Sequence, residues 1–319
     1  MVRDARMTSA RWTSAVLIAC LLVLTGCSFP GAQETGTRET GAPPATSPTT
    51  VEPGPGSVEI EGRRATLYAP VSRPAGSPAA LVVVLHGYTG EASGAIDFFG
   101  LRELADQRGF VILAPQGTTD PEGNTFWNAW ESCCNFHGSG VDDSGYLSRL
   151  IAQVVSTQGL DPSRVYLAGH SNGGFMAHRF ACDHPDQVAA VASLAGALDA
   201  AARCSPERTV SVLQVHGTAD DTIYFKGGEI AGKPYTSAKQ TAALWRRVDQ
   251  CSSRPRADGR LDADAALAGD DLRQTTWAGC RDGAEVSLWT ITGGNHVPAL
   301  TPGFAGALFD WFEAHQRPR

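Results

Sequence analysis

The sequence carries little positive charge. Of its 319 residues, 26 are basic and 33 are acidic, and the lysines are only Lys226, Lys233 and Lys239. No basic run interleaved with aromatic residues occurs, so the chain lacks the surface with which proteins neutralise phosphates. We therefore expect no nucleic-acid partner.

Signatures of metal and cofactor sites are also missing. The sequence contains no H-E-x-x-H, no C-x-x-C and no histidine pair four positions apart on a helix. It has neither a P-loop nor a G-x-G-x-x-G fingerprint after a strand. These absences predict an activity that uses no metal and no cofactor.

Long apolar runs are rare, and the clearest one lies near the N-terminus. Arg3, Arg6 and Arg11 precede an apolar segment at 15–24, which is too short for a permanent membrane span but typical of a signal peptide. The run ends in L-T-G-C, which resembles the bacterial lipobox, in which Cys27 is lipidated. The alternative is an ordinary signal peptide with Cys27 unmodified.

The composition divides the chain into three parts. We expect a lipoprotein signal peptide at 1–26, a lipidated N-terminus with a tether at 27–56, and a catalytic domain at 57–319. Of residues 28–56, 19 of 29 are Pro, Gly, Ser or Thr, and such a segment buries little apolar surface. The expected location is extracellular, either anchored to the outer face of the cytoplasmic membrane through lipid alone or secreted.

The cysteines agree with export. Without Cys20 and Cys27, six of the eight remain, and an oxidising compartment favours disulfides among them. We expect the local pairs Cys182–Cys204 and Cys251–Cys280. Adjacent Cys133 and Cys134 are left, as a vicinal disulfide, as two buried thiols or exchanged into other pairs.

The pattern from residue 57 onward predicts an α/β protein. Apolar strands are expected at 80–85, 110–114, 165–168, 188–194, 210–215 and 285–291, and a polar-apolar entry strand at 57–69. Helices are expected at 101–108, 141–158, 172–182, 237–249 and 302–314. This alternation predicts a mostly parallel sheet with helices on both faces. Residues 251–284 read as an irregular excursion.

The strongest motif is a G-x-S-x-G at 169–173, which follows a strand and opens a helix. A serine in such a sharp turn is presented at the carboxyl end of the sheet, and the flanking glycines leave room for the turn. Ser171 is therefore the predicted nucleophile. A serine hydroxyl needs an adjacent base, which a carboxylate orients.

The base and the acid are expected downstream, in the chain order serine, acid, histidine. His296 lies in a glycine-rich loop after the strand at 285–291, so it is the predicted base. Asp220 and Asp221 both follow the strand at 210–215. The pattern H-G-x-x-D-x-x-I selects Asp220, while Asp221 reads as a turn residue. His216 is expected to bond within its own turn.

Two loops complete the predicted site. The residues after the strand at 80–85 turn over the nucleophile, so that the N–H of Tyr88 or Thr89, together with that of Asn172, forms an oxyanion hole. Trp127 and Trp130 lie in a loop at a strand end. They either line a substrate pocket or anchor the loop in the core.

A family resemblance rests on motifs spread along the chain. They are, in order, LHGYTG, FVILAPQG, FWNAW, CC, VDDSGYL, DPSRVYLAGHSNGG, HGTADDTI and GGNHVP. Together they resemble the polyhydroxybutyrate depolymerase-like esterases, which include feruloyl and acetylxylan esterases of the α/β-hydrolase superfamily. The resemblance covers about residues 57–315. It implies a serine esterase acting on extracellular esters, with Ser171, Asp220 and His296 at the matching positions.

The chain departs from the depolymerase pattern in two respects. It has no room for a polymer-binding module, and Val297 follows His296 where a tryptophan is common. Two other interpretations stay open, a serine peptidase with the same triad and a non-catalytic surface-binding lipoprotein. The sequence indicates neither the acyl and alcohol groups of the substrate, a polyester oligomer or a plant-polysaccharide ester, nor the oligomeric state.

Overall fold

The computed structural model describes residues 54–71 and 78–317. The predicted signal peptide, Cys27 and most of the predicted tether lie outside these residues. Within the described part of the chain, no helix is both long enough and apolar enough to cross a membrane.

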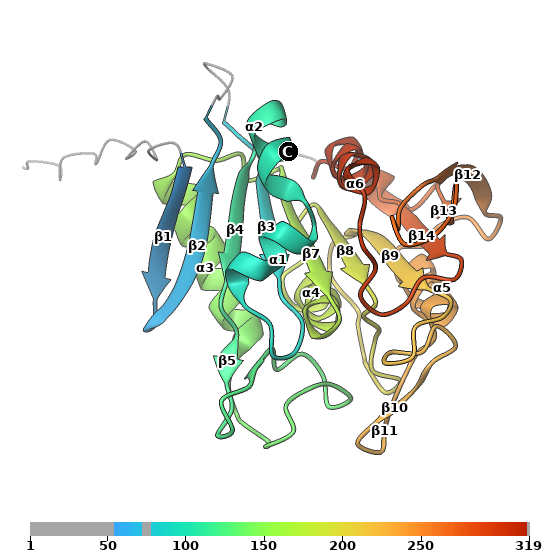
Figure 1. Ribbon diagram of the computed structural model, residues 1–319, viewed down its shortest axis with the longest axis horizontal. Coiled ribbons are helices and arrows are strands. Elements are labelled where there is room, and N and C mark those ends of the chain that lie inside the picture. The colour runs from blue at the N-terminus through green and yellow to red at the C-terminus, as the bar shows by residue number, and fades with distance from the viewer. Residues whose placement is uncertain (1–53, 72–77, 318–319) are drawn as a thin grey trace, which may run out of the picture. The chain divides into compact units, whose positions relative to one another are not determined.

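A ten-stranded sheet runs through the domain (Figure 1). In spatial order its strands are β1 (Gly54–Ile60), β2 (Arg63–Ala69), β4 (Val111–Pro115), β3 (Leu81–Leu85), β7 (Val165–His170), β8 (Ala190–Leu194), β9 (Ser211–Gly217), β14 (Val286–Ile291), β13 (Leu272–Trp277) and β12 (Arg256–Leu261). The six strands from β4 to β14 are parallel, and two antiparallel strands extend the sheet at each edge. Strands β3, β4 and β8 of the parallel centre are buried along their whole length, which explains their mainly apolar sequences.

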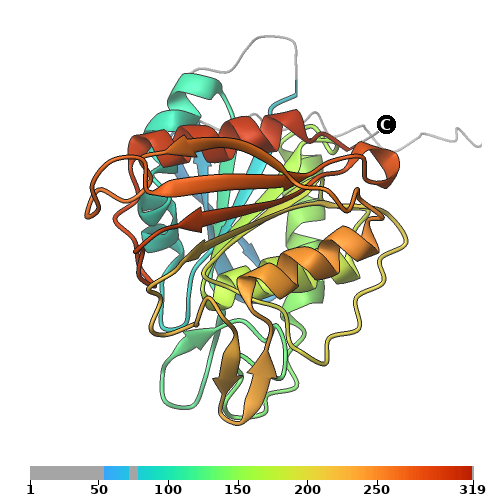
Figure 2. The same cartoon turned by 90° about the vertical axis from the view of Figure 1, so that its right-hand side faces the viewer.

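Six helices cover the two faces of the sheet. They are α1 (Ala92–Phe98), α2 (Leu101–Arg108), α3 (Asp143–Thr157), α4 (Asn172–Asp183), α5 (Ala238–Val248) and α6 (Pro302–Ala314), with a short 3₁₀ helix at Arg281–Gly283. The apolar sides of α1, α2 and α6 pack into one core, and those of α3, α4 and α5 into the other. Figure 2 shows α5 and α6 on opposite faces of the sheet. The expected α/β-hydrolase architecture is confirmed.

Small antiparallel hairpins decorate the loops. One pairs β5 (Thr118–Thr119) with β6 (Thr125–Phe126), and the other pairs β10 (Gly228–Ile230) with β11 (Lys233–Tyr235). Both lie beyond the carboxyl ends of the parallel strands (Figure 1). They therefore belong to the edge of the sheet where the site is expected.

The N-terminal edge differs from the expectation in two ways. The sheet begins at Gly54 rather than at residue 57, because Gly54 already pairs with Ala69. The expected single strand at 57–69 is a hairpin that turns at Glu61 and Gly62, which have φ of 55° and 73°. Two successive positive φ values are typical of the type I′ turn that joins two strands tightly.

The C-terminal edge also differs. Residues 251–284 are not irregular, since they contribute β12 and β13 to the sheet. The strand β12 is an exposed edge strand that bears Arg256, Asp258 and Arg260, so its sequence has no apolar pattern that would indicate a strand. The short helix α1 was not expected either, and Gly94 weakens its helical signal.

The described residues contain three disulfides. Cys182–Cys204 and Cys251–Cys280 are the two expected pairs, and Cys133–Cys134 form the vicinal disulfide that was one of the alternatives. The sequence separations of the first two pairs are 22 and 29 residues. Such loops stabilise a domain mainly by restricting its unfolded chain.

Removing the Cys182–Cys204 disulfide is expected to lower stability without altering the fold. In the double variant C182A/C204A the unfolded chain regains the freedom of that loop, so the free energy of unfolding falls by about 3–4 kcal/mol. Chemical denaturation of the oxidised proteins measures the difference. A variant as stable as the parent would contradict the prediction.

The buried carboxyl of Asp249 is expected to make stability depend on pH. Burial raises the pKa of Asp249 to about 7, whereas an aspartate in an unfolded chain titrates near 4. The folded protein therefore binds an extra proton between these values, and stability falls as the pH rises from about 4 to about 7. Asp249→Asn has no carboxyl to titrate, so this loss disappears in the variant. The free energy of unfolding of the variant minus that of the parent should therefore be about 1–3 kcal/mol higher at pH 8 than at pH 5. Melting temperatures at both pH values test this, and an equal difference at the two would refute it.

Candidate active site

Ser171 occupies a strained turn between β7 and α4. Its φ of 54° and ψ of −120° lie in a region that residues with a side chain rarely adopt. A Cβ on Gly169 would overlap the Gly173 carbonyl, and a Cβ on Gly173 would overlap the carbonyl of Leu85. Both motif glycines are therefore required for the turn.

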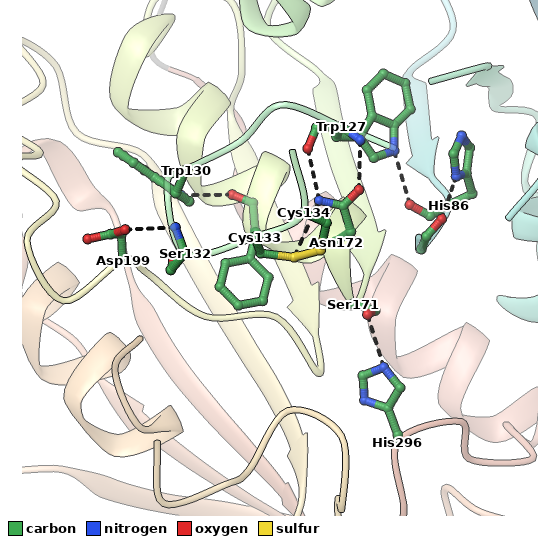
Figure 3. The surroundings of a disulfide bond; sticks show 12 residues. His86, Trp127, Trp130, Ser132, Cys133, Cys134, Ser171, Asn172, Asp199 and His296 are labelled. Carbon is green, nitrogen blue, oxygen red and sulfur yellow. Dashed lines mark hydrogen bonds between the residues drawn. A yellow bond between two sulfur atoms is a disulfide. The ribbon is translucent and has the colours of Figure 1, made fainter. Parts of the chain in front are cut away.

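The structure brings Ser171, His296 and Asp220 together. The Ser171 hydroxyl donates to His296 Nε2 at 2.9 Å, and His296 Nδ1 donates to Asp220 Oδ2 at 2.9 Å. Figure 3 shows the Ser171 hydroxyl facing the His296 ring. The three residues follow the carboxyl ends of β7, β14 and β9, which are parallel, so one edge of the sheet collects them.

The carboxylate of Asp220 is buried and surrounded by donors. Its Oδ1 accepts the backbone N–H groups of Thr222 and Ile223, each at 2.9 Å. Its Oδ2 accepts from His296 and lies 3.2 Å from His216 Nε2. Burial alone would raise the pKa of Asp220, but the hydrogen bonds from His216 and His296 outweigh it and hold the pKa well below its usual range. Asp220 is therefore ionised, as an acid that orients an imidazole must be.

Asp221, the other candidate acid, does not face the imidazole. It is exposed and accepts from the Thr222 hydroxyl at 3.3 Å. Of the two carboxylates, Asp220 is the one in contact with His296.

A buried polar chain stands behind the acid. The indole N–H of Trp245 donates to His178 Nδ1 at 3.0 Å, and His178 Nε2 donates to Gln214 Oε1 at 2.9 Å. The Gln214 amide in turn lies 3.3 Å from His216 Nδ1. This order leaves the proton of His216 on Nε2, which donates to Ile223 O at 2.7 Å and faces Asp220. The sequence indicated the turn contact of His216 but not its contact with Asp220, because the orientation of the His216 ring depends on Gln214 and on residues far away in sequence.

His170, inside the serine motif, supports the imidazole from the other side. Its Nε2 donates to the backbone carbonyl of His296 at 2.8 Å. Burial lowers the pKa of His170 to about 4, so this ring is neutral at neutral pH. The G-x-S-x-G motif accepts any residue at position 170, so it does not indicate this contact.

The predicted oxyanion loop lies over Ser171. A Cβ on Gly87 would stand 3.3 Å from Ser171 Cβ, which shows how closely the loop approaches. Tyr88 and Thr89 were the two alternative donors expected in this loop. The N–H of Thr89 is already used, since it donates to Thr125 O at 2.8 Å. Tyr88 is therefore the remaining alternative, together with Asn172 at the first position of α4.

A recess of about 180 Å³ opens beside this loop. Its lining residues are His86, Gly87, Gly90, Glu91, Gly94, Ala95, Phe98 and His170. Phe98 and His170 contribute rings whose centroids lie 4.6 Å apart. Aromatic rings therefore line one side of the recess, and one of them belongs to His170, which directly precedes Ser171 in the sequence.

The two tryptophans predicted to line a substrate pocket lie elsewhere. Trp127 is fully buried, with its indole N–H donating to His86 O at 3.0 Å, so the expectation that it lines an open pocket is wrong. Trp130 is partly buried, and its indole donates to Phe175 O at 3.2 Å beneath the guanidinium of Arg179. Both contacts agree with the alternative of loop anchors.

One group of potential metal ligands occurs in a neighbouring loop. Side-chain atoms of Asp120, Glu122 and His137 lie within 4.8 Å of one another. The Asp120 carboxylate already accepts from the backbone of Glu122 and Asn124 and from the hydroxyl of Tyr88. The Asp120 carboxylate therefore stabilises its own loop and connects it to the hydroxyl of Tyr88.

Comparison with known proteins places this geometry in a family. The model of the family described as esterase PHB depolymerase matches residues 65–228, which include Ser171 and Asp220. The chain belongs to the esterase PHB depolymerase family. His296 lies beyond the matched residues, so its position is carried by the geometry above.

Three curated relatives of this esterase PHB depolymerase family member are 25–30% identical to it over the aligned residues. Feruloyl esterase B of Piromyces equi is 28% identical over 228 residues, covering 69% of this chain and 40% of the relative. The putative esterase NocK of Nocardia uniformis subsp. tsuyamanensis is 30% identical over 236 residues, covering 70% and 66%. Poly(3-hydroxyalkanoate) depolymerase C of Paucimonas lemoignei is 25% identical over 252 residues, covering 74% and 58%. The chain thus matches less than two thirds of the length of each.

Solved structures show the same fold. An acetyl xylan esterase from Aspergillus awamori superposes with a TM-score of 0.59 at 17% identity, over 82% of this chain and 99% of that one. A thermostable esterase superposes with a TM-score of 0.54 at 12% identity, over 82% and 63%. These likenesses support the α/β-hydrolase fold of the described domain.

Replacing His216 is expected to shift the pH dependence of catalysis. In His216→Ala, Asp220 loses a neighbouring donor, so its negative charge holds a protonated His296 more firmly. The acidic limb of kcat/KM should move to higher pH by about half a unit to one unit. His216→Gln, which keeps an N–H donor, should restore part of the shift.

The matched control is His184→Ala. His184 follows α4 and packs on Phe180, away from the three site residues, so its removal should leave the pH profile unchanged. If His216→Ala lowers activity equally at every pH, its role is structural only.

Proposed function

We propose that the chain is a serine esterase that hydrolyses carboxylic esters through Ser171, His296 and Asp220. The observation that carries the proposal is the unbroken line of hydrogen bonds from the Ser171 hydroxyl through His296 to the ionised Asp220, at 2.9 Å and 2.9 Å. Membership of an esterase family supports the choice of ester hydrolysis.

In the proposed mechanism His296 transfers one proton in each of two steps. Its Nε2 takes the proton of Ser171 while the serine oxygen bonds to the ester carbonyl carbon, and it then gives that proton to the departing alcohol. Water next attacks the acyl-enzyme, giving a proton to His296, which returns it to Ser171 as the acid product leaves. Asp220 keeps its negative charge throughout and stabilises the imidazolium.

The developing oxyanion would be held by two backbone groups. The proposed donors are the N–H groups of Tyr88 and Asn172, which belong to the loop after β3 and to the first turn of α4. Removing one oxyanion donor typically lowers the rate by about 100- to 1000-fold. The positive end of the α4 dipole adds to this stabilisation.

The substrate class is proposed from the surroundings of Ser171. The recess of about 180 Å³ suits one small acyl or aryl group rather than a long acyl chain. Among the exposed large apolar side chains are Phe136, Tyr224 and Val297. The ring of Phe136 packs edge-on against that of Tyr88, while Tyr224 and Val297 lie on the loops of Asp220 and His296. An ester attached to an extracellular polymer or its fragments, either a polyester oligomer or a plant-polysaccharide ester, fits an apolar rim of this kind.

The proposed location is outside the cytoplasmic membrane. Three disulfides among the described residues support an oxidising compartment. We keep the signal peptide at 1–26, the lipid on Cys27 and the tether as part of this proposal, with the catalytic domain now starting at Gly54.

The test of the function is Ser171→Ala against a panel of esters. With methyl ferulate, acetylated xylo-oligosaccharides and 3-hydroxybutyrate oligomers, the wild-type protein should hydrolyse at least one substrate. The variant should lose about 10³- to 10⁶-fold in kcat, because the nucleophile is gone. Ser156→Ala, an exposed serine on α3, is the matched control and should keep full activity.

A fluorophosphonate probe gives an independent readout. It should label the wild-type protein and Ser156→Ala but not Ser171→Ala. Activity of Ser171→Ala near that of the wild type would mean that Ser171 is not the nucleophile. A wild-type protein inert towards both esters and probe would favour a binding protein, and turnover of peptides without esters would favour a peptidase.

A further inference from the structure

Trp127 lies between the two predicted halves of the oxyanion hole. Its backbone N–H donates to Asn172 Oδ1 at 2.7 Å, and its carbonyl accepts from Asn172 Nδ2 at 3.0 Å. Its indole N–H donates to the carbonyl of His86 at 3.0 Å. Figure 3 shows these contacts on opposite sides of one residue. Trp127 thus bonds both to the residue after the nucleophile and to the loop after β3.

The residues before Trp127 bind the same loop. The Thr125 carbonyl accepts from the N–H of Thr89 at 2.8 Å, and the Thr125 hydroxyl donates to Gly90 O at 2.6 Å. The loop of Tyr88 is therefore held from one end by Trp127 and from the other by Thr125. The segment 125–127 runs along the whole loop.

His86 makes the indole contact rigid. Its Nδ1 donates to Gly87 O at 2.7 Å, and its Nε2 accepts from the N–H of Gly117 at 2.9 Å. Burial lowers the pKa of His86, in agreement with a neutral ring that both donates and accepts. The ring of His86 also packs on that of Trp127, with centroids 5.1 Å apart.

The Cys133–Cys134 disulfide closes the other side of Asn172. The Asn172 Nδ2 lies 3.6 Å from Cys133 Sγ, and the backbones of Trp130 and Cys133 pair with each other. Both cysteines are buried (Figure 3). The Asn172 amide is therefore enclosed by Trp127 on one side and by the disulfide on the other.

We propose that Trp127 is a positioning residue that fixes the Tyr88 loop and Asn172 at the separation needed by two N–H groups that bind one oxyanion. This inference rests on the proposed function. Such donors work only when both lie about 2.7–3.1 Å from the oxyanion, and a displacement of about 1 Å lowers the rate about 100-fold. Trp127 is fully buried, so its hydrogen bonds do not exchange with water and hold that separation. Trp127 itself touches no reacting atom.

The variant Trp127→Phe tests the inference because it removes the indole N–H and keeps an aromatic ring. Its matched control is Trp311→Phe on α6, which likewise removes one indole hydrogen bond, to Glu285 at 3.2 Å. With the best ester substrate, Trp127→Phe should lower kcat about 10- to 100-fold and change KM less than about twofold. Trp311→Phe should keep the wild-type kcat.

A tetrahedral adduct gives a readout that mere loss of packing would not move. An alkyl boronic acid bonds to a serine hydroxyl and resembles the transition state. The inhibition constant of the boronic acid should be higher for Trp127→Phe than for the wild type, by the same factor by which kcat/KM is lower. The melting temperature of Trp127→Phe should fall no further than that of Trp311→Phe. Asn172→Ala, which keeps its own backbone N–H but releases Trp127, should show the same pattern, and the double variant should lose less than the product of the two effects.

The outcomes separate this inference from the proposed function. If wild type is active, Ser171→Ala is inactive and Trp127→Phe matches Trp311→Phe in kcat, the esterase stands and the positioning role falls. A loss confined to KM would also overturn the positioning role. If wild type hydrolyses no ester and binds no boronic acid, both fall together.

Discussion

The backbone turn at Ser171 is the constraint on which the remaining site depends. A residue with a side chain at φ 54° is held there only because its neighbours leave no other arrangement. Gly169 and Gly173 admit the close approach of strand β3 and helix α4, and the Ser171 N–H donates to Leu194 O at 2.8 Å. The turn therefore fixes the serine oxygen, the start of α4 and the path of the loop after β3 at once.

Around this turn the protein concentrates negative charge in one place and keeps nearby rings neutral. Asp220 is ionised although it is buried, because four N–H groups face its two oxygens. The pKa values of His170 and His178 are both lowered to about 4 by burial, so neither adds a competing positive charge. In a medium of low dielectric, such an arrangement directs the field of Asp220 onto His296.

The sequence predicted those parts of the molecule that local rules determine. The helices at 101–108 and 302–314 appear with the expected bounds, because apolar periodicity and a glycine or a proline mark their ends. The residues of the site were found because a tight turn needs glycine, and parallel strands bring their carboxyl ends to one edge. Ser171, Asp220 and His296 could thus be selected without knowledge of their distances.

What the sequence could not predict depends on contacts between distant segments. The strand β12 is polar because it lies at an edge, so its residues gave no apolar signal. Two roles of Trp127, in a pocket or in the core, stayed open because aromatic side chains occur in both, and only its burial and its contacts with His86 and Asn172 distinguish the two. His216 and Gln214 likewise acquire their orientation from partners that no spacing rule connects to Asp220.

The connection between β12 and β13 anchors the loop that carries His296. The backbone N–H of Thr292 donates to Asp271 O at 2.9 Å, and that of Ala299 donates to Asp264 Oδ1 at 3.0 Å. The Asp271 carboxylate in turn accepts the N–H of Asp264 at 3.1 Å, which joins the two anchor points. The connection between these two antiparallel strands thus anchors the His296 loop at both its ends, in a part of the chain that lies outside the residues matched by the family model.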